Sequence, residues 1–402
     1  MNASLNLSSA DVVAALGHLK PEEMEDLLAC ERRLEAFDLE GSLSKFTAAA
    51  WPIIEPATVF KPSWYLDAID EHLMAVTLGQ IKRLIINIPP RHTKSIKVSV
   101  IWPCWSWAIK PEDRFLFASY SGSLATKHSV DRRTLLRSRW FRERWGHLFE
   151  LADDQNQKTE FANTKRGHMV ATTLGGTSTG KGGNKLVVDD PINPEQAQSE
   201  VERATANRQF DQTLMTRLDQ PMTDAIVLIM QRLHEDDTTG HVLSKRSAAD
   251  AINLSDWTVL KLPSEITARE VVYFPISRKT HVRERGELLN PSRFPQSVLD
   301  QAKIDLGPIA YAGQHLQSPA ALEGNIIRRS WLRFFVPFDA AIPAAGTYNG
   351  LVVPEKDWQG RPTTINAPEK FDEIVQSQNE FLDPLMTSSA LAAVRAIVSR
   401  PI

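Results

Sequence analysis

Apolar residues along the chain recur at two distinct periods, and these periods predict its elements. Over residues 62–78, Trp64, Ile69 and Leu73 follow helical spacing, so we expect a helix there. After it, the run over residues 83–90 is rich in β-branched side chains and closes with two prolines. Such a short, continuously apolar run is typical of a buried parallel strand.

The strand pattern returns further along, with helical patterns between the strands. Further strands are expected at residues 114–120, 168–172, 185–189 and 224–230, and helices at residues 95–107 and 124–145. Strands that alternate with helices predict an α/β fold with a mostly parallel sheet.

The first 40 residues differ from the rest in charge. They hold nine acidic residues against Lys20, Arg32 and Arg33, a net charge of −6, and Leu27 and Leu34 recur at near-helical spacing. We expect a short acidic helical arm. It is either a solvated helix that packs one face on the main domain, or an arm that docks on a partner.

Composition narrows the class of protein. The chain has 402 residues, of which 42% are hydrophobic and 24% charged, as in ordinary globular proteins. Its 46 basic residues face 49 acidic ones, so any nucleic-acid contact must come from a local basic patch. Cys30 and Cys104 alone make neither a disulfide framework nor a zinc site, which fits a reducing cytoplasm. We expect no signal peptide, because the first residues show no basic region followed by an apolar run. We expect no membrane anchor, because no apolar run approaches the ~18–20 residues of a membrane helix.

The segment after the first strand has the layout of a phosphate-binding loop. Lys94 and Ser95 follow the strand and loop at the start of a helix, where a lysine reaches phosphates and a hydroxyl reaches Mg²⁺. The usual pattern has glycines where this chain has Ile88 and Thr93, so the pattern alone leaves an ordinary strand-to-helix connection equally open.

A pair of carboxylates closes a later strand. Asp189 and Asp190 end the strand at residues 185–189, after the glycine-rich segment 175–183. Magnesium nucleotide sites place carboxylates at this point of a neighbouring strand. We expect Asp189 to hold the metal and Asp190 to polarise the attacking water.

The strand at residues 224–230 also ends in polar side chains, Gln231 and Arg232. A polar residue here can sense the γ-phosphate, although a strand that simply ends in solvent is an equal alternative. His234 and His241 are seven residues apart rather than four, which excludes a metalloprotease helix motif.

A basic stretch offers a candidate DNA contact. Residues 127–144 carry seven basic against two acidic residues, interleaved with Trp140 and Phe141. A net charge of +5 on one helix could follow a DNA backbone, and a solvated helix face is the alternative. The basic residues are Lys127, Arg132, Arg133, Arg137, Arg139, Arg142 and Arg144.

Several motifs in order resemble the large terminase subunit of tailed bacteriophages, from roughly residue 45 to 377. The motifs lie at residues 88–95, 118–125, 179–183, 186–191, 230–235 and 313–314. The resemblance implies an ATP-driven DNA-packaging motor with an additional-strand P-loop ATPase domain and an RNase H-like nuclease domain. It implies ATP and Mg²⁺ as cofactors. It also implies double-stranded DNA, a small terminase subunit, a portal protein and a homo-oligomeric ring on the portal as partners, in the host cytoplasm.

The resemblance also assigns residues. The nucleotide loop comprises Pro90, Arg91, His92, Thr93, Lys94 and Ser95, and Arg91 matches the arginine of the family's deviant loop. Ser95 and Asp189 match the metal residues, and Gln231 lies in the coupling motif. Asp190 stands where the family often has a glutamate, one methylene longer. The catalytic set is therefore Asp190, Arg91 and Gln231.

Two weaker assignments stay open. Arg217 is a candidate arginine finger acting in cis or on a neighbouring subunit. Phe60, Trp64 and Tyr65 fall near the family's adenine-side segment, although aromatic residues on a helix are more often core.

The nuclease part departs from the family. Residues 370–377 resemble its first strand, but Gln378 and Asn379 follow where the family continues with tryptophan and an aspartate ligand. Glu380 and Asp383 do not supply the carboxylate cluster that two-metal hydrolysis needs. We therefore expect nuclease activity to be absent.

The expected organisation is an acidic arm at residues 1–45, an ATPase domain at 46–320, and a linker with a truncated nuclease start at 321–402. The leading hypothesis is a packaging-motor ATPase. The alternatives are a catalytically inactive prophage remnant that keeps nucleotide or partner binding, and a helicase-like P-loop ATPase.

Overall fold

The computed structural model describes residues 20–176, 180–249, 257–319, 346–348 and 351–353. The chain divides into two compact units, residues 1–321 and 322–402. In the second unit the described part is an antiparallel pair, β11 (Gly346–Tyr348) and β12 (Leu351–Val353). The predicted RNase H-like start at residues 370–377 lies outside the described residues.

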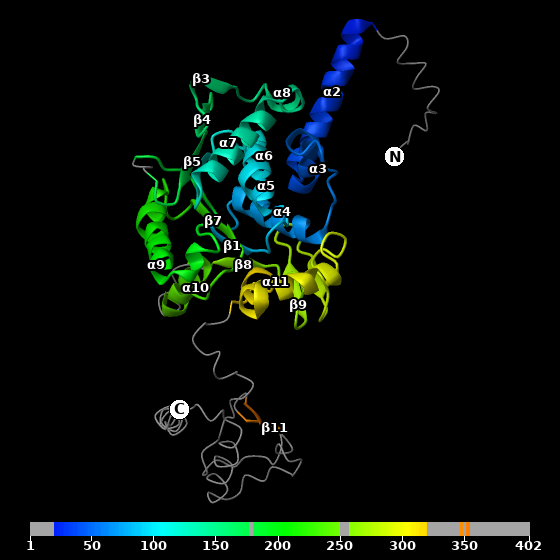
Figure 1. The fold of residues 1–402 in the computed structure, drawn as a ribbon. Coiled ribbons are helices and arrows are strands. Elements are labelled where there is room, and N and C mark those ends of the chain that lie inside the picture. The colour runs from blue at the N-terminus through cyan, green and yellow to red at the C-terminus, as the bar shows by residue number, and fades with distance from the viewer. Residues whose placement is uncertain (1–19, 177–179, 250–256, 320–345, 349–350, 354–402) are drawn as a thin grey trace, which may run out of the picture. The chain divides into compact units, whose positions relative to one another are not determined.

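The first unit is built on an eight-stranded sheet in the order β3-β4-β5-β2-β6-β7-β1-β8 (Figure 1). The pairs from β5 to β8 are parallel, while β3–β4 and β4–β5 are antiparallel. The strands are β1 (Arg83–Asn87), β2 (Arg114–Ser119), β3 (Leu151–Asn156), β4 (Glu160–Asn163), β5 (His168–Thr173), β6 (Lys185–Asp189), β7 (Ala225–Met230) and β8 (Thr258–Lys261); β9 (Glu270–Tyr273) and β10 (Thr280–Arg283) form a separate hairpin.

Helices cover both faces of this sheet. They are α2 (Pro21–Glu40), α3 (Leu43–Ile54), α4 (Trp64–Thr77), α5 (Lys94–Ile96), α6 (Trp102–Ile109), α7 (Gly122–Arg137), α8 (Arg139–Trp145), α9 (Glu200–Gln209), α10 (Thr238–Ala249) and α11 (Gln296–Gln314). Shorter turns are η1 (Lys97–Ile101), η2 (Gln196–Gln198), η3 (Phe210–Leu214) and η4 (Met215–Arg217). None of the helices in the described ranges is long and apolar enough to cross a membrane.

Two hydrophobic cores lie on opposite faces of the central strands. Along β7, Val227 and Ile229 join one core, which also contains Trp102 and Trp105. The alternate residues Ile226, Leu228 and Met230 join the other core, with Phe210 and Leu214. Because successive side chains of a strand point to opposite faces, a strand between two helical layers must be apolar throughout. The five strands predicted from the sequence are confirmed, and so is the α/β fold with a mostly parallel sheet.

Strand β7 lies between β1, which leads into the loop 88–93, and β6, which ends in Asp189. The order of strands thus places one strand between the loop and the two aspartates.

The helix predicted at residues 124–145 is wrong in one respect, because it is two helices. Ser138 interrupts it with extended backbone (ψ 147°), and its hydroxyl accepts a hydrogen bond from the N–H of Phe141 at the start of α8. Serine favours such an N-cap over a helix interior. The predicted helix at residues 95–107 is confirmed as α5, η1 and α6, which continue one another, with η1 a π-helical turn.

Candidate functional site

The site lies at the carboxyl edge of the parallel strands, where the loop after β1 turns into α5. Arg91 and Thr93 take left-handed backbone conformations with φ of 64° and 66°. Thr93 is the residue directly before the first helical residue, Lys94. The loop thus makes sharp turns without glycine and presents Lys94 and Ser95 at the start of the helical segment.

The predicted loop and carboxylate residues meet in space. Lys94 Nζ lies 2.5 Å from Asp190 Oδ1, and Ser95 Oγ donates a hydrogen bond of 3.0 Å to Asp189 Oδ1. These contacts join residues about 95 positions apart in the chain. The structure thus places Lys94 and Ser95 next to Asp190 and Asp189, the four residues on which the sequence argument rested.

Burial and the neighbouring positive charge shift the pKa values of the two carboxylates in opposite directions. Burial raises the pKa of Asp189 and of Asp190 above the usual aspartate range, and the ammonium of Lys94 opposes that rise. The side chain of Asp190 keeps 24% of its surface exposed, against 8% for Lys94 and for Asp189. Asp190 is therefore the carboxylate that can reach a water molecule.

Gln231 is placed beside Asp190 by β7. Its backbone hydrogen-bonds to the Asp190 carboxylate. Its side-chain Oε1 is buried and has no hydrogen-bond partner among the described residues. An unpaired buried amide oxygen is costly, so a site that gains a ligand or water here gains a partner for it.

The donor set fits Mg²⁺. Ser95 Oγ and the Asp189 carboxylate supply hard oxygen atoms, which Mg²⁺ prefers. Among the described residues no group of three or more His, Cys, Asp or Glu could hold a metal by itself. Mg²⁺ sites with few protein ligands take their remaining ligands from substrate phosphates and water.

His92 belongs to the loop, but its ring faces the protein interior. The ring stacks on Phe294 at 4.5 Å and meets Tyr65 edge-on at 5.8 Å. Its Nδ1 hydrogen-bonds to the carbonyl of Pro90 at 2.9 Å. Of the predicted nucleotide-loop side chains, that of His92 anchors the loop to the core and does not point to the site.

The three aromatic residues of the weaker adenine-side assignment are packing residues. Phe60 contacts Trp51, and Trp64 stacks on His281 at 4.0 Å. Tyr65 is buried and accepts a hydrogen bond from Asn290 at its hydroxyl. These contacts agree with the core interpretation that the sequence also allowed.

The two arginine candidates lie in different places. Arg91 is exposed on the loop itself. Arg217 lies at the other edge of the sheet, where its carbonyl accepts a hydrogen bond from the N–H of Gly183, just before β6. Asp189 closes the same strand six residues later, ~20 Å away at ~3.3 Å per residue. Arg217 therefore cannot reach its own chain's site, which removes its role in cis.

Three residues around Asp189 escaped the sequence argument. Ser99 Oγ donates a 2.7 Å hydrogen bond to Asp189 Oδ2, and His128 Nδ1 lies 3.8 Å from the same oxygen. Arg132 is fully buried, donates to the carbonyl of Ser99 and lies over the Phe117 ring at 3.7 Å. Serine one turn after Ser95 was the only signal in the sequence that could have pointed to this cluster.

The basic stretch does not form one exposed cationic face. Arg132 is buried, and Arg144 pairs with Glu35 of α2 at 2.5 Å. Lys127 and Arg139 pair within their helices, with Asp131 and Glu143. The expected net charge of +5 is thus reduced by burial and pairing. Exposed cations without an ion pair to another described residue remain at Arg137 and Arg142.

No protein-family model and no curated protein matches the chain. Its structure is similar to the crystal structure of the HK97 bacteriophage large terminase, at 10% sequence identity and a TM-score of 0.38, over 57% of this chain and 45% of that chain. It is also similar to the structure of a large terminase from a thermophilic bacteriophage, at 12% identity and a TM-score of 0.35, over 81% of this chain and 79% of that chain. The chain thus matches less than half of the HK97 protein.

Proposed function

We propose that this chain is a magnesium-dependent ATPase that works as a DNA-packaging motor subunit of the phage large-terminase type. One observation carries the ATPase part: Lys94 and Ser95, at a helix start after β1, contact Asp190 and Asp189 at the end of β6. The strand inserted between β1 and β6 gives this arrangement the topology of an additional-strand ATPase.

Each residue has a separate role. Lys94 moves from Asp190 to the nucleotide phosphates, which frees the Asp190 carboxylate to orient the attacking water and accept its proton. Ser95 and Asp189 would hold the metal, and bound Mg²⁺ would supply charge neutralisation at the phosphates. Arg91 adds a cation from the exposed loop, and Gln231 links the Asp190 carboxylate to β7.

The motor part of the proposal is supported by the ordered sequence motifs. It carries with it double-stranded DNA, a small terminase subunit and a portal protein as partners, and the cytoplasm of the bacterial host as location. A helicase-like ATPase shares the nucleotide site, so sustained strand unwinding by the purified chain would favour that alternative.

The first experiment is Mg²⁺-dependent ATP hydrolysis by the purified chain, with and without double-stranded DNA. We expect turnover that falls by at least ~100-fold in Lys94→Ala and in Asp190→Asn. Lys165→Ala and Asp305→Asn remove a lysine and an aspartate elsewhere on the unit's surface and should keep the wild-type rate.

The outcomes separate the hypotheses. A folded wild-type protein without turnover, with circular dichroism intact, would leave the inactive remnant as the better account. Turnover that survives both site variants would place the chemistry elsewhere in the molecule.

The absence of nuclease activity remains a separate prediction. It rests on Asn379 standing where the family has a metal-binding aspartate, within a segment outside the described residues. Incubation of supercoiled DNA with the chain and Mn²⁺ or Mg²⁺ should leave the DNA uncut, and nicked or linear product would contradict the prediction.

A further inference from the structure

Helix α2 packs only its carboxyl half on the rest of the first unit. Ala36 and Leu39 are its buried residues, and the carbonyl of Leu39 accepts a hydrogen bond from the indole N–H of Trp105. Glu35 pairs with Arg144 of α8. Over residues 21–31, every residue except Met24 is exposed, and the helix stands out from the body of the unit (Figure 1).

The face of α2 turned away from the unit is apolar. Leu27, Leu34 and Phe37 are 46%, 68% and 77% exposed. Their spacing of seven and three residues places them on one side of a helix, as in a helix that packs against a partner. Asp26 and Glu31 flank this outer stripe, and α2 as a whole has eight carboxylates against two arginines. The outer stripe (Leu27, Leu34, Phe37) is thus an apolar surface with an acidic border.

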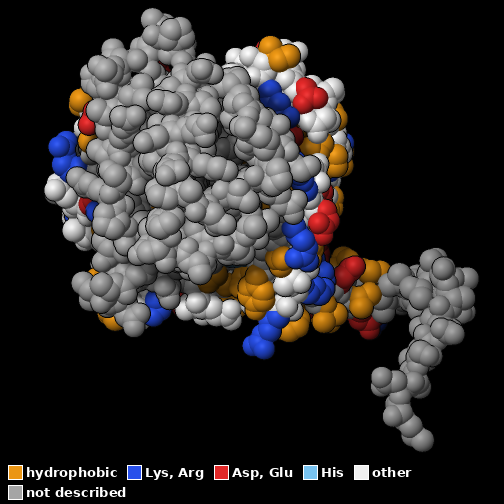
Figure 2. Space-filling view, turned by 90° about the horizontal axis from the view of Figure 1, so that it is seen from below, with side chains coloured by type: hydrophobic (Ala, Val, Ile, Leu, Met, Phe, Trp, Pro, Cys, Tyr) orange, Lys and Arg blue, Asp and Glu red, His pale blue; other side chains and the backbone are white. Residues whose placement is uncertain are grey.

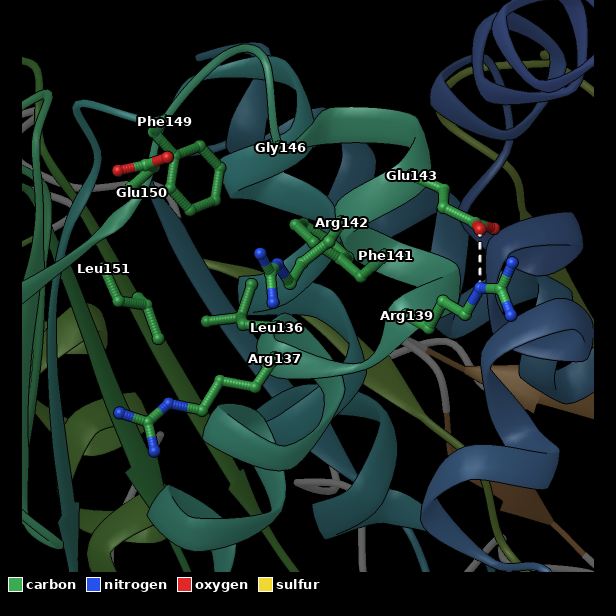
Figure 3. A pocket seen from close by; sticks show the side chains of 10 residues that line it. All are labelled: Leu136, Arg137, Arg139, Phe141, Arg142, Glu143, Gly146, Phe149, Glu150 and Leu151. Atoms are coloured by element: carbon green, nitrogen blue, oxygen red, sulfur yellow. Dashed lines mark hydrogen bonds and ion pairs between the residues drawn. The ribbon is translucent and has the colours of Figure 1, made fainter. Parts of the chain in front are cut away.

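A pocket of about 750 Å³ lies on the same unit and is lined by apolar side chains and by more arginines than glutamates. Figure 3 shows Leu136, Phe149 and Leu151 around it, with the guanidinium groups of Arg137 and Arg142 turned toward the hollow. The pocket lies between the end of α7, α8 and the start of β3. On the face seen in Figure 2, basic and acidic side chains lie along the rim together with hydrophobic ones. The lining also includes Glu150 and the pair of Arg139 with Glu143, so this arginine pocket combines an apolar floor with a rim of three arginines and two glutamates, of which Arg137 and Arg142 form no ion pair with another described residue.

We propose that the outer stripe of α2 docks in the arginine pocket of a second copy of this chain. Leucine and phenylalanine side chains match the apolar floor, and the acidic border matches Arg137 and Arg142. A contact between two α2 stripes is disfavoured, because it would set carboxylates against carboxylates. Within one chain α2 and α8 already form ion pairs, Glu35 with Arg144 and Arg32 with Glu143.

The contact is head-to-tail, because the docked surface and the receiving surface are different. A dimer formed in this way keeps one free stripe on one copy and one free pocket on the other, so copies add to a ring if the rotation closes and to an open chain if it does not. Ion pairs at the pocket rim are screened by salt, so association weakens as ionic strength rises.

Analytical ultracentrifugation of the full chain across a concentration series tests the proposal. The stripe variant is Leu34→Glu with Phe37→Glu, and the pocket variant is Arg137→Glu with Arg142→Glu. Each alone should lower the association constant by about tenfold or more. Mixed together, they should form a one-to-one dimer and nothing larger, because only one intact stripe and one intact pocket remain.

Matched controls are Val59→Glu with Ile304→Glu, and Arg208→Glu with Arg285→Glu, which change exposed residues outside both surfaces and should associate as wild type. A pocket variant that still associates fully would overturn the proposal in favour of paired α2 helices. A wild type that is monomeric at every concentration, with a pocket variant that loses only DNA binding, would overturn it in favour of a DNA phosphate contact. ATP hydrolysis is measured on the same samples, so the failure of the nucleotide site and of the docking contact are told apart.

Discussion

His92 ties the nucleotide loop to the core through a neutral ring. Burial lowers its pKa to about 4, and the hydrogen bond to the carbonyl of Pro90 opposes this only in part. Because the buried ring is neutral in the folded chain, the unfolded chain binds a proton at His92 more tightly than the folded chain does. As the pH falls below the ordinary pKa of about 6.5, protonation therefore favours the unfolded chain. Acid therefore weakens the attachment of the loop.

This residue makes a pH prediction. Stability should be complete above pH ~6.5 and decline as the pH falls toward 4, with at most about 3 kcal/mol coming from His92. In His92→Phe the loss of stability that comes from His92 should vanish. The other titrating groups should contribute equally in the wild type and the variant. Urea unfolding at pH 7, 6 and 5 measures the difference, and His147→Phe, at an exposed histidine, is the control. Parallel pH curves for wild type and His92→Phe would contradict it.

At the level of single residues, the sequence predicted the side chains that contact one another in the site, but not the further side chains that contact Asp189. Lys94, Ser95 and the two aspartates were predictable because their positions at strand and helix ends follow from local pattern. Ser99 and His128 were not, because a contact between α7 or η1 and the end of β6 depends on how helices cross the sheet.

The π-helical turn η1 carries a buried ion pair that joins three elements. Lys97 Nζ lies 2.5 Å from Asp70 of α4 and donates a 2.7 Å hydrogen bond to Thr47 of α3. Both charged side chains are at most 2% exposed. Burial raises the pKa of Asp70 to about 6 and lowers that of Lys97, and the pairing opposes both shifts. Lys97 is the first residue of η1 and follows the nucleotide loop, which ends at Ser95, by two residues.

Removing one partner should cost much more than removing both. Lys97→Met leaves Asp70 buried without its counter-charge and should lower the free energy of unfolding by ~3–5 kcal/mol. Lys97→Met with Asp70→Leu should recover most of that loss, because a hydrophobic pair replaces a desolvated ion pair.

Chemical unfolding of the single and double variants gives these values. The matched control is Lys45→Met, which breaks the exposed pair with Asp38 and should cost under ~1 kcal/mol. If Lys97→Met and Lys45→Met lowered the free energy of unfolding equally, burial of the ion pair would not determine the size of the loss.

Elements were predictable where both faces are buried. Strands β1, β2, β6 and β7 are almost entirely buried and read as continuous apolar runs. Strands β8, β9 and β10 are only four residues long and largely exposed, so their sequences resemble loops. The break at Ser138 was missed because the apolar pattern continues across it into α8.

On the scale of the whole molecule, all residues assigned to the nucleotide site belong to the first unit, which ends at residue 321. Both hydrophobic cores belong to it as well. We therefore expect a chain shortened to residues 1–321 to unfold cooperatively and to hydrolyse ATP at the rate of the full chain. Calorimetry and the ATPase assay measure this, with Lys94→Ala in the shortened chain as the inactive control. A shortened chain that folds but has lost turnover would mean that residues 322–402 contribute to the site.

The inserted strand β7 also sets the distance between the nucleotide loop and the two aspartates. Strands in a sheet lie ~4.8 Å apart, so one strand between β1 and β6 holds the loop and the carboxylates roughly 10 Å from each other at the level of the backbone. Side chains from the two sides then meet halfway, as Lys94 and Asp190 do. The width of one strand thus sets the distance between the loop after β1 and the carboxylates after β6. A shift of β7 along its neighbours would change how these two sides are aligned, but not the distance between them.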